Sequence, residues 1–263
     1  VSQGLLHAYM PDFCKQVDLV ISPSQGMEKI LRQYGVKGRV EVIPNGADLN
    51  PFQKAKPLSR SGFGFTKKDT LLMYVGRIAP EKNLEMLLQS FAGVARVVPN
   101  TYLLVLGSGQ KDYEEKLLAL SAELQMKDRV RFMGMIPYVQ LPRYLGMSDI
   151  FVTTSVTEVH PFSVIEAMAS GLPTVGIDSP GISDSIVNGK TGLLATNDLA
   201  AYTAKLTYLC LDKDLQKKMG VAARKAAEQF SIERTTKLIL RHYTRLKERR
   251  KRAKERLDKR LRK

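Results

Sequence analysis

From residue 70 onward, short and nearly continuous apolar segments alternate with longer segments in which apolar residues recur every three or four positions. The apolar segments predict strands of a parallel sheet buried on both faces, and the periodic segments predict the helices that cross between them. We expect strands at 71–75, 102–106, 130–133, 150–154 and 173–177. We expect helices at 83–98, 112–125, 140–147 and 162–170. This order is typical of an open, doubly wound α/β domain of the Rossmann-like type, which binds ligands beyond the carboxyl ends of its strands.

The first part of the chain does not continue this pattern. It predicts a strand at 17–22, a helix at 26–34 and a strand at 40–43, followed by a polar loop at 53–68. Because so short a piece cannot bury a core alone, it either joins the main sheet or is the remnant of a separate one. Residues after 230 predict a long basic helix. We therefore expect three parts, namely the remnant at 1–38, the ligand-binding α/β domain at 39–230 and the basic helix at 231–263.

Charge is concentrated near the C-terminus. The formal net charge is +15, but 13 basic and only three acidic residues lie in 241–263. The remaining residues are only mildly basic and contain no nucleic-acid-binding motif, so we expect no nucleic-acid partner. Cys14 and Cys210 lie in no metal-binding pattern, which predicts reduced thiols and no zinc site. We also expect no other metal and no cofactor. No apolar run is long enough to span a membrane and the first residues do not form a signal peptide, which predicts a cytoplasmic protein.

The basic tail at 241–263 has two interpretations. Leu246, Ala253, Leu257 and Leu261 form a thin apolar stripe at helical spacing among the cations. The tail is either a solvated helix that ends the chain or a helix that lies on an anionic membrane surface. The narrow stripe without an aromatic anchor favours the solvated helix, whereas the number of cations supports peripheral attachment to a membrane.

Two cations, Arg77 and Lys82, follow the first of the main strands. The planar fork of an arginine and the point charge of a lysine both bind phosphate oxygens well. Two solvated surface cations would fit the same positions, and the position in the sequence does not decide between these interpretations.

The second main strand ends in Gly107-Ser108-Gly109. Gly107 has no side chain and would let the backbone approach a ligand closely. The dinucleotide-binding pattern GxGxxG fails, because its third glycine would fall at Asp112. A plain turn between strand and helix is therefore the alternative interpretation.

The strongest signal lies between residues 157 and 173. Glu158 closes a strand, and Glu166 lies in a helix that starts near Pro161. The start of that helix is expected to leave three amides free for a phosphate, those of Phe162, Ser163 and Val164. Glu166 is about one turn further along, where its carboxylate would accept hydrogen bonds from two ribose hydroxyls. Its apolar sequence neighbours argue against a solvated helical glutamate.

The segment from Glu158 to Pro173 resembles the signature of glycosyltransferase family 4, in which two glutamates seven residues apart precede an A-M-A-x-G-x-P run. Four other segments resemble motifs of the same family in the same order. Residues 18–24 match the final strand of its first domain, and residues 43–48 match its I-P-N-G linker. Residues 75–83 match its G-R-x-x-x-E-K-N donor motif, and residues 188–194 match its N-G-x-T-G-L-L turn.

This resemblance implies a GT-B fold, of which the chain is the second, donor-binding domain, and a retaining transfer of a hexose from a nucleoside diphosphate sugar. The sequence leaves the base open, and a UDP-type donor is the first expectation. It also implies the roles of single residues. Arg77 and Lys82 would neutralise the leaving diphosphate, Glu166 would bind the ribose and Met135 would meet the base through its backbone. Glu158 would contact the transferred sugar as the catalytic residue. Two cations and a helix N-terminus can stabilise the departing charge without a metal ion.

The chain departs from the family pattern in two places. The segment from His160 to Ser163 stands where the family often has Gly-Phe-Gly, which leaves the sugar open, and His160 is either a pocket ligand or a structural residue. Only 17 residues precede the strand motif at 18–24, so we expect most of the acceptor-binding half to lie outside this chain. The acceptor substrate stays unassigned, although lipid acceptors are common in the family.

Apolar residues of the first segment favour self-association.

Three other functions compete with this interpretation. The first is a non-catalytic nucleotide-sugar-binding module, or a subunit that another chain completes. The second is a sugar-nucleotide epimerase, against which the two spaced glutamates and the two cations argue. The third is an oxidoreductase, which the failed dinucleotide pattern disfavours.

Overall fold

The protein is described by a computed structural model that covers residues 3–262. The chain divides into two compact units, one of Ala47–Glu228 and one that joins Val1–Gly46 to Gln229–Lys263. The C-terminal helix thus groups with the N-terminal segment, although the two are far apart in the sequence. The predicted division into parts at 1–38, 39–230 and 231–263 stays a prediction.

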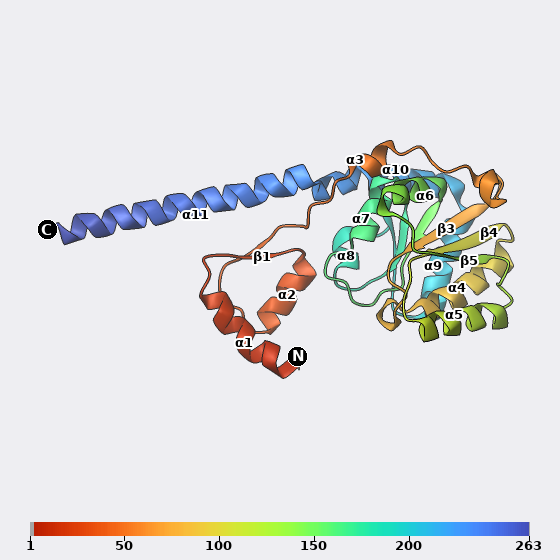
Figure 1. Ribbon diagram of the computed structural model, residues 1–263, viewed down its shortest axis with the longest axis horizontal. Coiled ribbons are helices and arrows are strands. Elements are labelled where there is room, and N and C mark those ends of the chain that lie inside the picture. Colours follow the sequence, from red (N-terminus) through yellow and green to blue (C-terminus); the bar gives the residue numbers. More distant parts are fainter. Residues whose placement is uncertain (1–2, 263) are drawn as a thin grey trace. The chain divides into compact units, whose positions relative to one another are not determined.

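The larger unit is built on a six-stranded parallel sheet, in which Figure 1 labels β3, β4 and β5. The strand order is β5-β4-β3-β6-β7-β8. The strands are β3 Thr70–Val75, β4 Thr101–Leu106, β5 Val130–Gly134, β6 Ile150–Val152, β7 Thr174–Ile177 and β8 Gly192–Ala195. All five predicted strands occur in the predicted order, and β8 adds a sixth at the edge. The central strand β3 is buried from Thr70 to Tyr74, as a strand covered on both faces should be. The predicted doubly wound α/β sheet is therefore confirmed.

Helices cover both faces of this sheet. Helices α4, α5 and α9 pack on one face, and α3, α6, α7 and α10 pack on the other (Figure 1). Their bounds are α3 Asn50–Lys54, α4 Leu84–Val97, α5 Lys111–Glu123, α6 Leu141–Met147, α7 Phe162–Ala169, α8 Ile182–Ser185, α9 Leu199–Leu211 and α10 Lys213–Ala227. Short 3-10 turns occur at η1 Arg60–Phe63, η2 Pro80–Lys82, η3 Tyr138–Gln140 and η4 Glu228–Phe230.

The strand order reverses at the centre of the sheet. From β3 the chain moves through β4 to β5 at one edge, and it then returns to β6, which pairs with β3 and starts the series toward the other edge. The loops after β3 and β6 therefore leave the sheet toward opposite faces. The crevice between two such loops is the place where open α/β sheets bind ligands.

The prediction of a loop at 53–68 is wrong in part, because this segment contains the 3-10 turn η1. One side chain holds this turn in place. The guanidinium of Arg60 donates to the carbonyls of Met147 and Asp69 at 2.8 and 3.1 Å and to the Asp149 carboxylate at 2.9 Å. These partners lie up to 89 residues away, so the local sequence pattern carries no sign of them.

The smaller unit contains a second sheet. Its elements are α1 Gln3–Lys15, β1 Val20–Ser22, α2 Gln25–Gln33, β2 Val40–Val42 and α11 Ile232–Leu261. The strands β1 and β2 pair with each other in parallel and not with the main sheet, so of the two predicted alternatives the structure shows the separate sheet. Helix α1 was not expected from the sequence.

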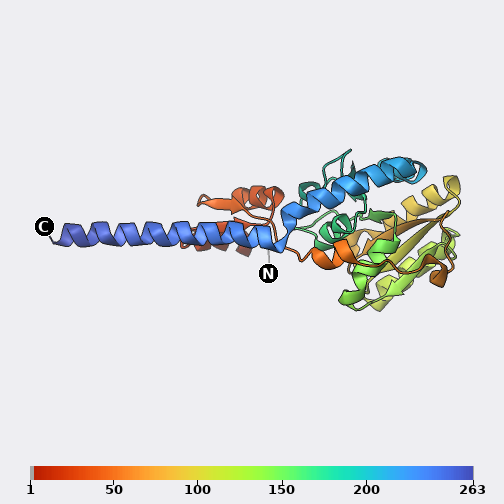
Figure 2. The same cartoon turned by 90° about the horizontal axis from the view of Figure 1, so that it is seen from above.

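Helix α11 confirms the predicted long basic helix. Its 30 residues form one continuous element (Figure 2), about 45 Å long at 1.5 Å per residue. The Ser231 hydroxyl caps it by accepting from the Arg234 amide. Thr235 is buried, Arg250 forms an ion pair with Asp18 at 2.5 Å, and residues 247–262 are exposed.

Candidate functional site

The loops at the switch point bring a lysine and a glutamate together. Lys82 follows β3, Glu158 follows β6, and the Lys82 Nζ lies 2.5 Å from a Glu158 carboxylate oxygen. Only 14% of the lysine side chain and 19% of the glutamate side chain are exposed. The Thr154 hydroxyl donates to the backbone carbonyls of Lys82 and Asn83, each at 2.9 Å, and so links the two loops. A pair so shielded from water is stable only while both partners remain.

Arg77 lies in the same loop but reaches into solvent. Its side chain is 75% exposed and pairs with Glu81 at 3.0 Å, a contact that contributes little in water. Its backbone is held by the buried Tyr74, because the Tyr74 hydroxyl donates a hydrogen bond to the Arg77 carbonyl at 2.8 Å. The guanidinium is therefore available to an anionic ligand at little cost.

The N-terminus of α7 meets these loops. Pro161 precedes the first helical residue. The amide of Val164 donates to the Pro161 carbonyl at 3.2 Å, so the prediction of three free amides is wrong for Val164. A tight turn at a helix start makes such a bond, and a sequence pattern does not reveal it. The amides of Phe162 and Ser163 have no protein acceptor within residues 3–262 and carry the positive end of the helix dipole.

These groups surround one cavity of about 240 Å³. Of the predicted site residues, the cavity is lined by Arg77, Lys82, Glu158, Phe162 and Ser163. It is not lined by Gly107, Met135, Val164 and Glu166. The structure thus brings the cations, one glutamate and the helix start together.

His160 also lines this cavity and is buried. Its ring stands edge-on to that of Phe162, with centroids 6.5 Å apart. Burial lowers the pKa of His160, and the nearby charge of Asp184 opposes that effect. Burial thus disfavours the charged form of the imidazole, which would otherwise be a further cation beside Lys82.

Glu166 lies inside α7 and does not line the cavity. It is only 5% exposed, which excludes a solvated helical glutamate. The Tyr138 hydroxyl donates to its Oε1 at 2.5 Å. Burial raises the pKa of Glu166, and the hydrogen bond from Tyr138 opposes that rise. Sequence reasoning missed Tyr138, whose one local signal is its place in the turn that follows Met135.

The glycine turn after β4 has a structural reason. Gly107 has φ +137°, and a Cβ atom there would lie 1.8 Å from the Gly76 carbonyl oxygen. A Cβ at Gly109 would lie equally close to the Ile78 carbonyl oxygen. The close approach is therefore between two loops of the protein, as the plain-turn alternative implies. A ligand contact at Gly107 stays a prediction, and so does the base contact at Met135, a residue that is 77% exposed.

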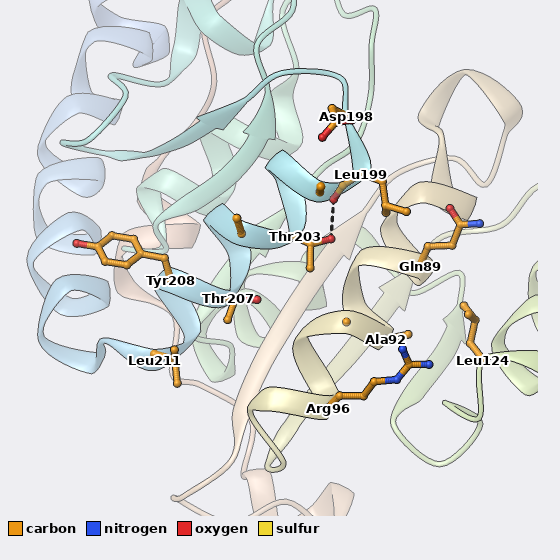
Figure 3. Close-up of a pocket in the computed structure, with 13 residues that line it drawn as sticks. Gln89, Ala92, Arg96, Leu124, Asp198, Leu199, Thr203, Thr207, Tyr208 and Leu211 are labelled. Atoms are coloured by element: carbon orange, nitrogen blue, oxygen red, sulfur yellow. Dashed lines mark hydrogen bonds between the residues drawn. The ribbon is translucent and has the colours of Figure 1, made fainter.

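A wider groove of about 1040 Å³ lies elsewhere, between α4 and α9 (Figure 3). Its walls approach closely at Gly93, where a Cβ atom would lie 2.9 Å from a methyl group of Thr203. The Thr203 hydroxyl is already bound to the Leu199 carbonyl at 2.6 Å. The groove lies on the outer surface of helices and not at the carboxyl ends of the strands, so we do not assign the ligand to it.

Two features are absent from the part of the chain that the structure describes, residues 3–262. No helix there is long and apolar enough to cross a membrane. Among the side chains of residues 9–262, no group of three or more His, Cys, Asp or Glu is placed to hold a metal ion. The expected lack of a metal and of a cofactor stays a prediction.

The fold and the site together define a Rossmann-like domain with a cationic crevice at its switch point. The family described as "Glycosyl transferases group 1" matches residues 55–226, and the family described as "Glycosyltransferase Family 4" matches residues 2–51. Because the first match covers more than half of the chain, the chain belongs to the group 1 glycosyl transferases. The resemblance to glycosyltransferase family 4 is thereby confirmed.

Individual relatives agree with this assignment. A D-inositol 3-phosphate glycosyltransferase of Nocardia farcinica is 30% identical over 86% of this chain and 52% of its own length. An alpha-monoglucosyldiacylglycerol synthase of Streptococcus pneumoniae is 31% identical over 72% of this chain and 44% of its own length. The chain thus spans about half the length of these curated relatives.

Solved structures show the same fold. A sucrose-phosphate synthase of Thermosynechococcus elongatus superposes with a TM-score of 0.83 at 24% identity, over 93% of this chain and 62% of that one. Anabaena HepE, solved with UDP and glucose, superposes with a TM-score of 0.81 at 22% identity, over 93% of this chain and 68% of that one. The predicted second domain of a GT-B fold, with part of the first, is confirmed.

Proposed function

We propose that this chain carries the donor-binding half of a retaining glycosyltransferase, which moves a hexose from a UDP-type nucleoside diphosphate sugar to an acceptor. One observation carries the proposal. Lys82 and Glu158, which are 76 residues apart, meet at 2.5 Å in a cavity that Arg77 and the start of α7 also line. Positive groups of this kind at the switch point of a parallel sheet suit a diphosphate.

The geometry suggests how the leaving group is stabilised. Arg77, Lys82 and the amides of Phe162 and Ser163 offer charge and hydrogen bonds to a diphosphate that gains negative charge as the sugar leaves. In the free protein Glu158 balances the charge of Lys82, and a bound diphosphate shares that lysine. The Glu158 carboxylate then stands beside the phosphate end of the cavity, where the proposed catalytic contact to the sugar would be made.

The remaining roles belong to the same proposal. Glu166 binds the ribose, Met135 meets the base, and Gly107 lies near the donor. Anabaena HepE has been solved with UDP, which supports the choice of base. The name of the Streptococcus pneumoniae relative contains a diacylglycerol, which makes a lipid the first acceptor class to test.

Binding of UDP tests the site. We expect calorimetry to detect UDP binding to this chain, and Arg77→Ala to weaken it by about tenfold or more, because a charge-assisted hydrogen bond is lost. Lys111→Ala is the matched control, since Lys111 is an exposed cation whose ion pair with Glu115 lies outside the cavity. Equal loss in both variants, or no loss in Arg77→Ala, would remove Arg77 from the site.

The alternative of a non-catalytic module predicts the same binding. Transfer of glucose from UDP-glucose by the full-length protein separates the two. Turnover that Glu158→Gln abolishes supports the enzyme, whereas UDP binding without turnover on lipid and soluble acceptors favours the module or a subunit that another chain completes.

We also propose that α11 lies on an anionic membrane surface, which would keep the protein in the cytoplasm but peripheral to the membrane. The exposed part of α11 carries most of the 13 cations of 241–263, and each cation near such a surface contributes about 1 kcal/mol. Self-association stays a prediction. The exposed and stacked rings of Tyr9 and Phe13 offer one apolar surface for it.

Vesicle co-sedimentation tests the role of α11. We expect the chain to sediment with vesicles that contain phosphatidylserine and not with pure phosphatidylcholine vesicles. Added salt should release it, because screening weakens contacts between exposed charges. Truncation after Tyr243 removes most of the cations and should abolish binding. Unchanged sedimentation of the truncated chain would show that another surface makes the contact.

A further inference from the structure

Tyr138 is 65% exposed, but its side chain makes two contacts inside the protein. It lies in η3, directly after the segment that follows β5, and its ring packs edge-on against the buried Phe52 of α3 with centroids 6.1 Å apart. Its hydroxyl donates to Glu166 Oε1 at 2.5 Å. The hydroxyl thus ties η3 to α7, and the ring contact with Phe52 supports it from the same side chain.

Glu166 depends on such a tie. A glutamate side chain has several rotatable bonds, and this one is almost fully buried in an apolar part of α7. A buried carboxylate needs hydrogen bonds to remain charged. A carboxylate has about four acceptor positions on its two oxygens. With Oε1 held by one donor, the direction of Oε2 and of the remaining lone pairs is set.

We infer that Tyr138 is a positioning residue, which holds the Glu166 carboxylate in the orientation that accepts hydrogen bonds from the two ribose hydroxyls of the nucleotide. This inference rests on the proposed donor site, since it gives Glu166 its ribose role. It adds a residue from a different element, η3, to the part of the site that selects a ribonucleotide. Tyr138 acts through Glu166 and needs no contact with the ligand.

The test compares UDP with 2′,3′-dideoxy-UDP by calorimetry. The wild-type chain should prefer UDP, and Glu166→Gln should lose most of that preference. Tyr138→Phe keeps the ring against Phe52 and removes only the hydroxyl, and it should reduce the preference by about tenfold. Its affinity for the dideoxy nucleotide should change less than twofold. The double variant should match Glu166→Gln, because the hydroxyl acts only through the carboxylate.

Tyr144→Phe is the matched control. Tyr144 is the nearest tyrosine along the chain, and its ring packs edge-on against Phe63 at 5.9 Å, so this variant should keep the full preference. If Tyr138→Phe keeps the preference while Glu166→Gln loses it, the positioning role is overturned and the donor site stands. If Tyr138→Phe weakens both nucleotides equally, its role is structural and the inference is also overturned. A full preference in Glu166→Gln would instead overturn the ribose role in the proposed function.

Discussion

Replacing Lys82 with methionine is expected to weaken UDP binding by about a hundredfold, which corresponds to about 2.7 kcal/mol. Two effects add. The ammonium no longer contacts the diphosphate, and Glu158, which it neutralised at 2.5 Å, is left as an uncompensated carboxylate beside an anionic ligand. Methionine preserves most of the side-chain volume, so the cavity wall stays filled.

A second variant separates the two effects. Lys82→Met combined with Glu158→Gln removes the repulsion and should recover part of the affinity, and it should also be more stable than Lys82→Met alone. Lys116→Met is the control, since Lys116 pairs with Glu85 at 3.0 Å on the exposed surface of α5. Calorimetry on the four proteins decides the matter, and wild-type affinity in Lys82→Met would exclude Lys82 as a phosphate ligand.

Replacing Gly107 with alanine is expected to lower the free energy of unfolding by about 3 kcal/mol. The backbone there has φ +137°, and the new methyl group would lie 1.8 Å from the Gly76 carbonyl oxygen. A backbone oxygen cannot rotate away as a flexible side chain does, so the loops after β3 and β4 must separate. Because Gly76 precedes Arg77, UDP binding should weaken as well.

Gly62→Ala provides the control for this substitution. A Cβ atom at Gly62 would meet nothing within 4 Å, so its free energy of unfolding should stay within about 0.5 kcal/mol of the wild-type value. Urea unfolding of both variants measures the difference. Equal stability of the two would mean that the loops tolerate a side chain at Gly107, and the glycine would then need another explanation.

The sheet could be predicted from the sequence because its pattern is local. A strand buried on both faces must be apolar at almost every position, and the segments that became β3 and β4 show this. The order of strands and helices then leaves few topologies. The edge strand β8 and the helices α1, α3, α8, α9 and α10 were missed because none of these segments was interpreted as a regular element. The turn η1 was missed because its stability comes from the distant acceptors of Arg60.

The sequence by itself determined the family, the chemical types at the site and their places after strands. Arg77, Lys82 and Glu158 each follow a strand, and the carboxyl ends of parallel strands share one edge of a sheet, so their proximity could be expected. Only the tertiary structure decided which of these groups touch. The pairing of Lys82 with Glu158, the bond of the Val164 amide to Pro161 and the approach of Gly107 to Gly76 depend on distances of a few ångströms.

Tyr138 shows this limit most clearly. It and Glu166 are 28 residues apart on different elements, and no periodicity or motif of the sequence links them. Their contact exists because η3 and α7 pack with α3 on the same face of the sheet, where the ring of Phe52 holds the ring of Tyr138. Local sequence sets the conformation of each element, whereas the packing of elements against one another sets which side chains meet, and that is a property of the folded chain alone.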